Sequence, residues 1–346
     1  SQRDLNMRPL TLGMAALVAP TVFVTHVSAH EHDAELRLET LVSYFADGAV
    51  VGEPSIVDCK LNDGTETSCF AITFTGEPES HKSGPWCPTN ISQSGPAAGG
   101  IWLENDQVYE VDGPFIKRLA EFYADDKFQL FNPETGEIRV TDTLEGCQAA
   151  ARPNVDPEWN QYCVECEISY MTRPSTKTYV IPVEPVAADA PTPSTDNAGV
   201  GIAISGARID GPAPRDAILA AHTLAPFDDC GGHVNLGVGY HYHAVTDCAT
   251  SVAAGVEGHA PIVGIALDGH MIHTRFDEDG TEPSNLDACR GHGTEGLGYH
   301  YHANDPGANA IVPCHTAATG CALTGEDTQC DATIIVEHRG PARDHD

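Results

Sequence analysis

The chain has 346 residues, 41% of them apolar, so it can form the core of one large domain or of two ordinary domains. Its 50 acidic side chains outnumber the 18 basic ones and give a formal net charge of −32. Proteins that bind nucleic acids or anionic membranes need clusters of basic side chains, so the composition argues against both kinds of partner. It gives no information about protein partners.

The first residues are typical of an export signal. Arg8 precedes an apolar run at 9–24, and the small residues of Val27-Ser28-Ala29 follow at a position that suits signal peptidase. We predict a signal peptide over residues 1–29, in which Met7 is the natural start and residues 1–6 are not native. The expected location is secreted, periplasmic or cell-surface.

All 12 cysteines follow this segment, and an even number of cysteines in an exported chain indicates disulfides. Gly-bearing turns favour the short-range pairs Cys59–Cys69 and Cys321–Cys330. Cys163 and Cys166 have a spacing that also occurs in redox enzymes and zinc sites. In an exported chain with ten further cysteines, we interpret both as structural disulfide cysteines.

Residues 30–180 are predicted as an N-terminal β-rich region with disulfides, because strand-like runs such as 70–74 alternate with Gly and Pro turns. The best helix candidate is 114–124, with a proline tolerated in its first turn. A Pro- and Ala-rich stretch at 181–199 predicts a linker or surface loop. Residues 315–346 are predicted as a C-terminal disulfide loop and tail.

The second half of the chain contains one pattern twice. Each copy has a Val-Gly-Ile-Ala run, a Cys-x-Gly-His sequence, and then Gly-Tyr-His-Tyr-His-Ala at 239–244 or 298–303. We therefore predict a duplicated, pseudo-twofold β unit over 200–314, with its copies at 200–248 and 263–314. The expected fold class is mainly β, as a β-rich α+β protein stapled by disulfides.

The Val-Gly-Ile-Ala runs predict buried strands, each closed by a glycine turn. Asp268-Gly269, followed by Met271 and Ile272, indicates a tight hairpin. The helix signal in this half is weak and is confined to 214–222.

Alternation along a strand sends His241 and His243 to one face and the two tyrosines to the other. His233 is expected to supply a third imidazole, because the glycines before it let the backbone turn back. The same roles in the second copy fall to His292, His300 and His302. Three imidazoles with an open position are a common metal-binding arrangement, and we expect copper first and zinc second. The alternative is a structural network of hydrogen-bonded histidines.

Other residues are candidates near these trios. His270 and His273 follow the Asp-Gly turn and could add metal ligands. Asp228 and Asp287, which precede the two Cys-x-Gly-His sequences, are expected, together with Asp268, to orient histidines through hydrogen bonds.

Two further expectations concern the chain around the trios. Bridges Cys230–Cys248 and Cys289–Cys314 would enclose the two trios. If cleavage follows Ala29, the new terminus with His30 and His32 would form a Cu(II) or Ni(II) chelate.

At these residues the sequence resembles the YHYH-domain family of exported bacterial and algal proteins. The resemblance is carried by 230–243, by the matching 289–302, and by Val-Gly-Ile-Ala-Leu-Asp-Gly at 263–269, and it covers roughly 178–315. It implies an exported protein, but no settled activity. The family pattern has one copy of the motif where this chain has two, and His270 and His273 replace the aromatic residues expected after Asp-Gly.

Three functions are compatible with the sequence. The leading hypothesis is an exported protein that binds a transition metal through one or both histidine trios. The second is a metal-dependent oxidoreductase or hydrolase with an open metal position between the repeats. The third is a cell-surface or matrix protein in which the histidines are structural.

Overall fold

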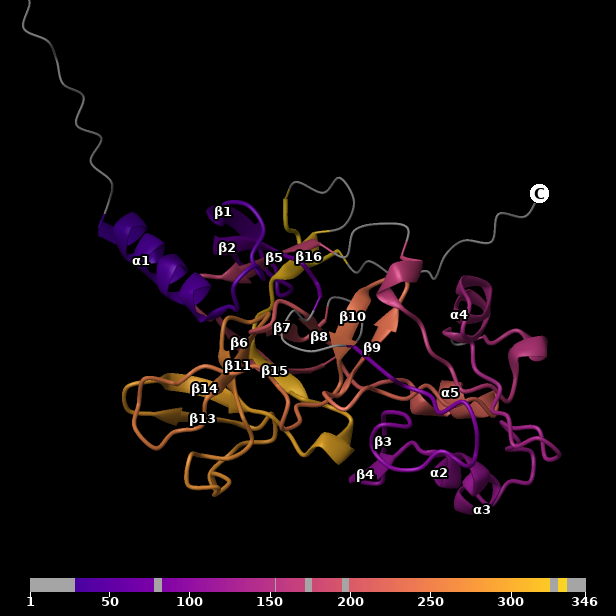
Figure 1. The fold of residues 1–346 in the computed structure, drawn as a ribbon. Coiled ribbons are helices and arrows are strands. Elements are labelled where there is room, and N and C mark those ends of the chain that lie inside the picture. The colour runs from indigo at the N-terminus through magenta and orange to yellow at the C-terminus, as the bar shows by residue number, and fades with distance from the viewer. Residues whose placement is uncertain are drawn as a thin grey trace, which may run out of the picture.

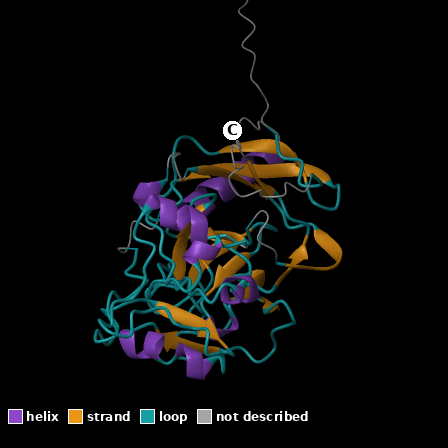
Figure 2. Cartoon of the chain, turned by 90° about the vertical axis from the view of Figure 1, so that its right-hand side faces the viewer, coloured by secondary structure: helices purple, strands orange, loops and turns teal. Residues whose placement is uncertain are grey.

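The computed structural model describes residues 29–77, 83–152, 154–171, 176–194, 199–323 and 329–334. The predicted signal segment up to residue 28 lies outside these residues. The described chain is mainly β, as expected, and its strands form one large sheet and three small ones (Figure 1). Long loops join the strands, and the short helices lie around them (Figure 2).

The first described element is helix α1 (Ala29–Tyr44), which contacts a four-stranded sheet. This sheet has the order β1 (Ser55–Lys60), β2 (Glu66–Phe74), β5 (Lys177–Pro182) and β16 (Cys321–Leu323). Leu41 and Phe45 pack with Phe74 of β2 in one core. The predicted N-terminal region, 30–180, and the predicted C-terminal segment, 315–346, therefore share one sheet, because β16 of the latter pairs with β5.

The next part of the chain forms a second core with a β-hairpin and short helices. The hairpin consists of β3 (Ile101–Glu104) and β4 (Gln107–Glu110). The predicted helix at 114–124 is present as two short helices, α2 (Gly113–Lys117) and α3 (Leu119–Phe122), which are separated by Arg118. Two more helices follow, α4 (Leu144–Ala150) and, later in the chain, α5 (Arg215–Ala220), which confirms the weak signal at 214–222.

The eight-stranded sheet has the order β13-β14-β12-β11-β7-β8-β10-β9. Its strands are β7 (Gly201–Ala203), β8 (Arg208–Ile209), β9 (Gly232–Asn235), β10 (Gly239–Tyr242), β11 (Ile262–Ala266), β12 (Met271–His273), β13 (Gly291–Thr294) and β14 (Gly298–His302). Figure 1 shows β9 and β10 at one end of this sheet and β13 and β14 at the other.

The two halves of this sheet are built alike. In each half the first two strands are antiparallel, the YHYH strand pairs in parallel with the second strand, and the Cys-x-Gly-His strand closes the edge. The halves meet where β7 pairs with β11, with Ile202 opposite Ile265. These two residues hold the same place in their Val-Gly-Ile-Ala runs, so the pairing has twofold character, whereas an origin by duplication stays a prediction.

Six disulfides staple the described chain, as is typical of proteins that fold in an oxidising compartment. All four predicted pairs are present, namely Cys59–Cys69, Cys230–Cys248, Cys289–Cys314 and Cys321–Cys330. Cys163 and Cys166 bond to Cys87 and Cys147, respectively, and not to each other. Their role is therefore structural.

The segment predicted as a linker is partly a strand. β6 (Ala187–Pro193) pairs with β15 (Cys314–Ala317) in a two-stranded sheet. Part of the predicted loop at 181–199 is therefore a strand. The side chains of β6 are largely exposed, which explains why its composition resembles that of a loop. Among the described helices, none has the length and apolar character needed to cross a membrane.

Candidate metal centres

Each YHYH segment forms a triangle of imidazoles with the strand beside it. β9 pairs antiparallel with β10 and places His233 directly opposite His241, while His243 follows two residues later on the same face. β13 and β14 repeat this arrangement, with His292 opposite His300. Residues opposite each other in an antiparallel pair have Cβ atoms about 4.5–5.5 Å apart, so the register alone brings the rings together.

The first histidine cluster consists of His233, His241 and His243. Its ring centroids are 4.7, 4.8 and 5.1 Å apart, and one nitrogen of each ring lies within 4.8 Å of the others. His241 and His243 are buried and His233 is half-buried. Phe227 packs against the rings of His233 and His243, so the cluster lies against an apolar wall.

The second histidine cluster consists of His259, His292, His300 and His302, with one nitrogen of each within 4.8 Å of the others. The Nε2 atom of His292 lies 3.0 Å from that of His300 and 3.2 Å from that of His302. The ring of His273 lies beside them, with its centroid 4.6 Å from that of His300. The structure thus places His273, one of the two extra candidates, next to the trio.

His259 is the member that the sequence did not predict. It lies in the loop before β11, far along the chain from the motif, and no spacing signals its role. Its Nε2 atom is buried and has no hydrogen-bond partner among the described residues. Its ring centroid is 4.8 Å from that of His300, so the unpartnered nitrogen belongs to the cluster.

Hydrogen bonds at Nδ1 fix the tautomer of most of these histidines. The acceptors are backbone carbonyl oxygens, which cannot donate, so Nδ1 carries the proton and Nε2 carries the lone pair. The donors and acceptors are His241 to Gly239 at 3.0 Å, His243 to Gly211 at 2.6 Å, His300 to Gly298 at 3.0 Å, His302 to Thr274 at 3.0 Å, and His273 to Ala260 at 2.7 Å. Such bonds are the usual support of metal-ligating histidines.

The lone pairs of His300 and His302 both point at His292 Nε2. His292 Nδ1 donates to Asn285 Oδ1 at 2.8 Å when the amide oxygen faces it, which leaves a lone pair on its Nε2 as well. Lone pairs that face one another at 3.0 and 3.2 Å repel unless a proton or cation lies between them. Two nitrogens bound to one ion at about 2.0–2.1 Å are about 2.9–3.4 Å apart, so the spacing fits shared ligation.

Burial keeps these imidazoles neutral. Removal from water lowers the pKa of His241 to about 4 and the pKa of His233 and His243 to about 3. In the second cluster it lowers the pKa of His300 and His302 to about 4. Neutral imidazoles are the form that binds a metal, so both clusters are ready to act as ligands at neutral pH.

Comparison with family models gives a match described as YHYH protein over residues 178–285. This segment contains β7, β8 and the complete first histidine cluster. The segment is a YHYH domain. The second YHYH string lies beyond the matched residues, and comparisons with curated proteins and with solved structures give no match.

The opposite face of the YHYH domain carries the tyrosines, and the predicted aspartates bind these rather than the histidines. Tyr240 donates to Asp228 at 2.7 Å, and in the second copy Tyr299 donates to Asp287 at 2.7 Å. Each aspartate also accepts two backbone N–H groups of its Cys-x-Gly-His turn, so it closes that turn around the tyrosine.

Asp268 behaves in the same way and accepts from the Tyr301 hydroxyl at 2.5 Å. The prediction that these three aspartates orient histidines was therefore wrong. Each carboxylate accepts a hydrogen bond from a tyrosine hydroxyl, because the aspartates lie on the tyrosine side of the strands.

Close packing on the tyrosine face explains the glycine of Cys-x-Gly-His. A Cβ on Gly232 would lie 2.2 Å from the Tyr240 hydroxyl oxygen, and one on Gly291 would lie 2.0 Å from that of Tyr299. Only glycine leaves room for the tyrosine that reaches the aspartate. The motif is thus a structural unit on one face and a set of imidazoles on the other.

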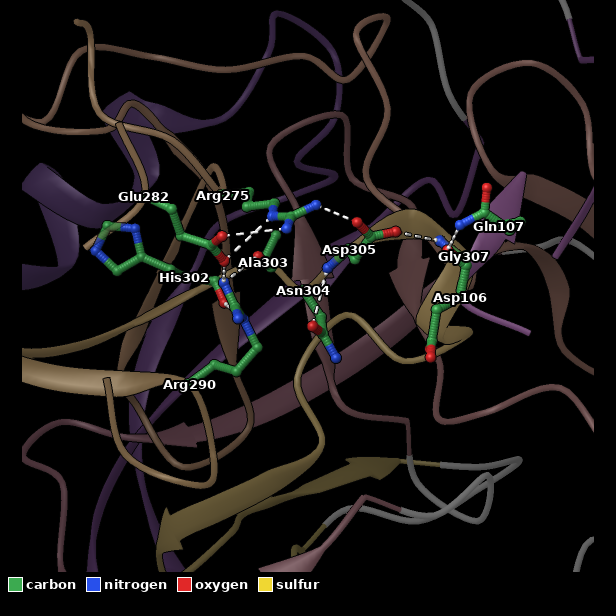
Figure 3. Close-up of polar contacts among 10 residues, drawn as sticks. All are labelled: Asp106, Gln107, Arg275, Glu282, Arg290, His302, Ala303, Asn304, Asp305 and Gly307. Atoms are coloured by element: carbon green, nitrogen blue, oxygen red, sulfur yellow. Dashed lines mark hydrogen bonds and ion pairs between the residues drawn. The ribbon is translucent and has the colours of Figure 1, made fainter. Parts of the chain in front are cut away.

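A network of ion pairs braces the second cluster (Figure 3). Arg290 donates from Nη2 to Glu282 Oε1 at 2.6 Å and from Nε to the backbone oxygen of His302 at 3.2 Å. Arg275 binds the same Glu282 through two 3.1 Å contacts and also pairs with Asp305. These contacts fix the end of β14, from which His302 enters the cluster.

The remaining candidates lie elsewhere. His270 is on the tyrosine face, where its Nδ1 contacts the Tyr299 backbone oxygen at 3.1 Å and its ring packs on Tyr299, so the expectation of a metal ligand there was wrong. His30 and His32 belong to helix α1, and the side chain of His32 is exposed. The terminal chelate requires cleavage after Ala29 and stays a prediction.

The two clusters do not share one site. In the sheet, β12, β11, β7 and β8 lie between β14 and β10, the strands that carry them. One alternative from the sequence was an enzyme with an open metal position between the repeats. The two clusters therefore cannot both supply ligands to a single metal ion in such a site.

Proposed function

We propose that the protein is an exported transition-metal-binding protein that holds one ion in each histidine cluster, with copper as the first choice and zinc as the second. Imidazole nitrogen suits both ions, and Cu(II) stands highest in the affinity order of the divalent metals. A bound ion would supply Lewis acidity or, for copper, one-electron chemistry.

The observation that carries this proposal is the meeting of Nε2 atoms in the second cluster at 3.0 and 3.2 Å. Nδ1 donates in His300 and His302, so no proton of theirs explains the contact. The Nε2 atom of His259, which is buried and has no hydrogen-bond partner within the described part of the chain, adds a third reason to place a cation there.

The first cluster supports the same function through its matching geometry. Its ring spacings of 4.7, 4.8 and 5.1 Å compare with 4.7, 5.2 and 5.0 Å for the equivalent pairs in the trio of the second cluster. Six disulfides favour a secreted, periplasmic or cell-surface location, where a metal site of neutral imidazoles meets ions without competition from reduced cytosolic thiols.

The test is metal analysis of protein produced in an oxidising compartment. The protein is stripped with a chelator, loaded separately with Cu(II) and Zn(II), desalted, and analysed by elemental mass spectrometry. We expect two ions per chain. His241→Ala with His243→Ala should remove one ion, and His300→Ala with His302→Ala should remove the other.

Two controls complete the experiment. Deletion of residues 30–32 should leave both ions, which separates the clusters from a terminal chelate. His222→Ala changes a histidine that pairs with Asp125 outside the clusters and should also leave both. If neither Cu nor Zn binds stoichiometrically, the proposed function is wrong, and the result favours the alternative of a surface or matrix protein with structural histidines.

A further inference from the structure

The two clusters differ in the number of imidazoles that converge. Four rings form the compact set in the second cluster, whereas three form it in the first among the residues that the structure describes. Metal sites closed by four protein ligands hold their ion, while sites with three protein ligands leave a position for water or another small molecule. The difference in ligand number therefore predicts that the second cluster only holds its ion, whereas the ion in the first cluster can also bind a small molecule.

Strand register shows a second difference at equivalent positions. Tyr242 pairs with Ile209 in the first half, and Tyr301 pairs with Ile272 in the second. The next residue along each strand is Asp210 in the first half and His273 in the second. A carboxylate thus stands beside the first cluster where an imidazole stands beside the second.

The carboxylate of Asp210 is held in place. Arg208 contacts its Oδ1 atom at 2.5 Å, and both side chains are buried. Its Oδ2 atom lies 3.8 Å from His241 Nε2, which is too far for a direct hydrogen bond. This oxygen lies beside the trio and can accept a hydrogen bond from a water bound to an ion held there.

Resting on the proposed function, we propose that the second cluster is a closed four-imidazole site and that the first is a three-imidazole site whose fourth ligand is an exchangeable water. Asp210 accepts a hydrogen bond from this water and disfavours anions in its place. His241 and His243 are buried and Phe227 covers two of the rings, so the position admits only small ligands such as water or azide. Turnover at this protein, if it occurs, belongs to the first cluster.

The experiment uses two single-cluster variants of the full chain loaded with one equivalent of Cu(II). His300→Ala with His302→Ala retains the first cluster, and His241→Ala with His243→Ala retains the second. Electron paramagnetic resonance is recorded with and without azide. We expect the azide to change the spectrum of the first cluster and to leave that of the second unchanged, with nitrogen hyperfine structure from three and four imidazoles, respectively.

Two substitutions test the cause of the difference. Asp210→Asn keeps the shape but removes the charge, and should tighten azide binding at the first cluster about tenfold. His259→Gln should open the second cluster and make its spectrum respond to azide. In the unaltered chain, which needs no substitution to fold, the first equivalent of copper should show four nitrogens, because the closed site fills first.

The outcomes are distinct. Copper binding at both clusters with an equal response to azide, or with no response at either, overturns this proposal and leaves metal binding intact. Failure of both single-cluster variants and of the unaltered chain to bind either copper or zinc overturns the proposed function itself.

Discussion

Replacing Gly291 with alanine places a Cβ 2.0 Å from the Tyr299 hydroxyl oxygen and 2.3 Å from the ring carbon that carries it. The tyrosine must move and leave Asp287, to which it donates at 2.7 Å. Loss of a hydrogen bond to a charged group costs about 1.5–3 kcal/mol, and overpacking costs about 1–3 kcal/mol. Tyr299 is half-buried, so water offsets part of the loss, and we expect a net cost of about 2–3 kcal/mol.

The matched control is Gly293→Ala, two residues further along β13. A Cβ there meets nothing within 4 Å, so this substitution should be neutral or slightly stabilising. Gly232→Ala should cost more than Gly291→Ala, about 3–5 kcal/mol, because its tyrosine, Tyr240, is completely buried.

The assay is urea unfolding of the metal-free protein with its disulfides intact. In a chain that also carries Tyr299→Ala, the obstacle is gone and Gly291→Ala should cost almost nothing beyond the tyrosine change. Equal unfolding midpoints for the Gly291 and Gly293 variants would refute the reasoning that the tyrosine requires the glycine.

Three further predictions follow from the site. The pKa of His300 and His302 is lowered to about 4 in the folded protein, whereas the unfolded chain takes up protons near pH 6.5, so the stability of metal-free protein should fall as the pH drops from about 6.5 to about 4. Urea midpoints across this range check it, and a smaller decline is expected in a His300→Gln, His302→Gln variant. Glu282→Gln weakens the pairing with Arg275 and Arg290 and should raise the Cu(II) dissociation constant of the second cluster about tenfold, with no change at the first, as measured by competition with a chelator. Cys289→Ser with Cys314→Ser opens a bridge between residues 25 apart and should cost about 3 kcal/mol in urea unfolding, and unchanged stability would contradict this.

Much of the fold was predictable because local chemistry sets it. Alternation in Tyr240-His241-Tyr242-His243 separates the two faces, and the glycine turns fix where the strands end. Two of the predicted cysteine pairs follow from short spacings around turns, and the other two follow from the second cysteine of each repeat. What failed depended on distant contacts: β6 is an exposed strand because β15 pairs with it, and composition alone does not reveal that partner.

The site shows the same division. The two histidine trios could be read from the sequence, since strand period and register place their members together. His259 could not, because a loop brings it to the cluster and loops carry no periodic signal. The aspartates were misassigned for a related reason: proximity to the motif is visible in the sequence, but the side of the strand on which a carboxylate lies is not.

The strand order has a consequence for loading. Five steps across the sheet separate β10 from β14, and at about 4.8 Å per step this is about 24 Å. Paired metal ions that share a ligand lie about 3.5–4 Å apart, so ions in the two clusters cannot form a dinuclear centre. The separation between the clusters is about three times the screening length of about 8 Å at physiological salt, so the repulsion between ions in the two clusters is weak. Each cluster should therefore fill according to its own affinity, and half-loaded chains should persist as a stable population.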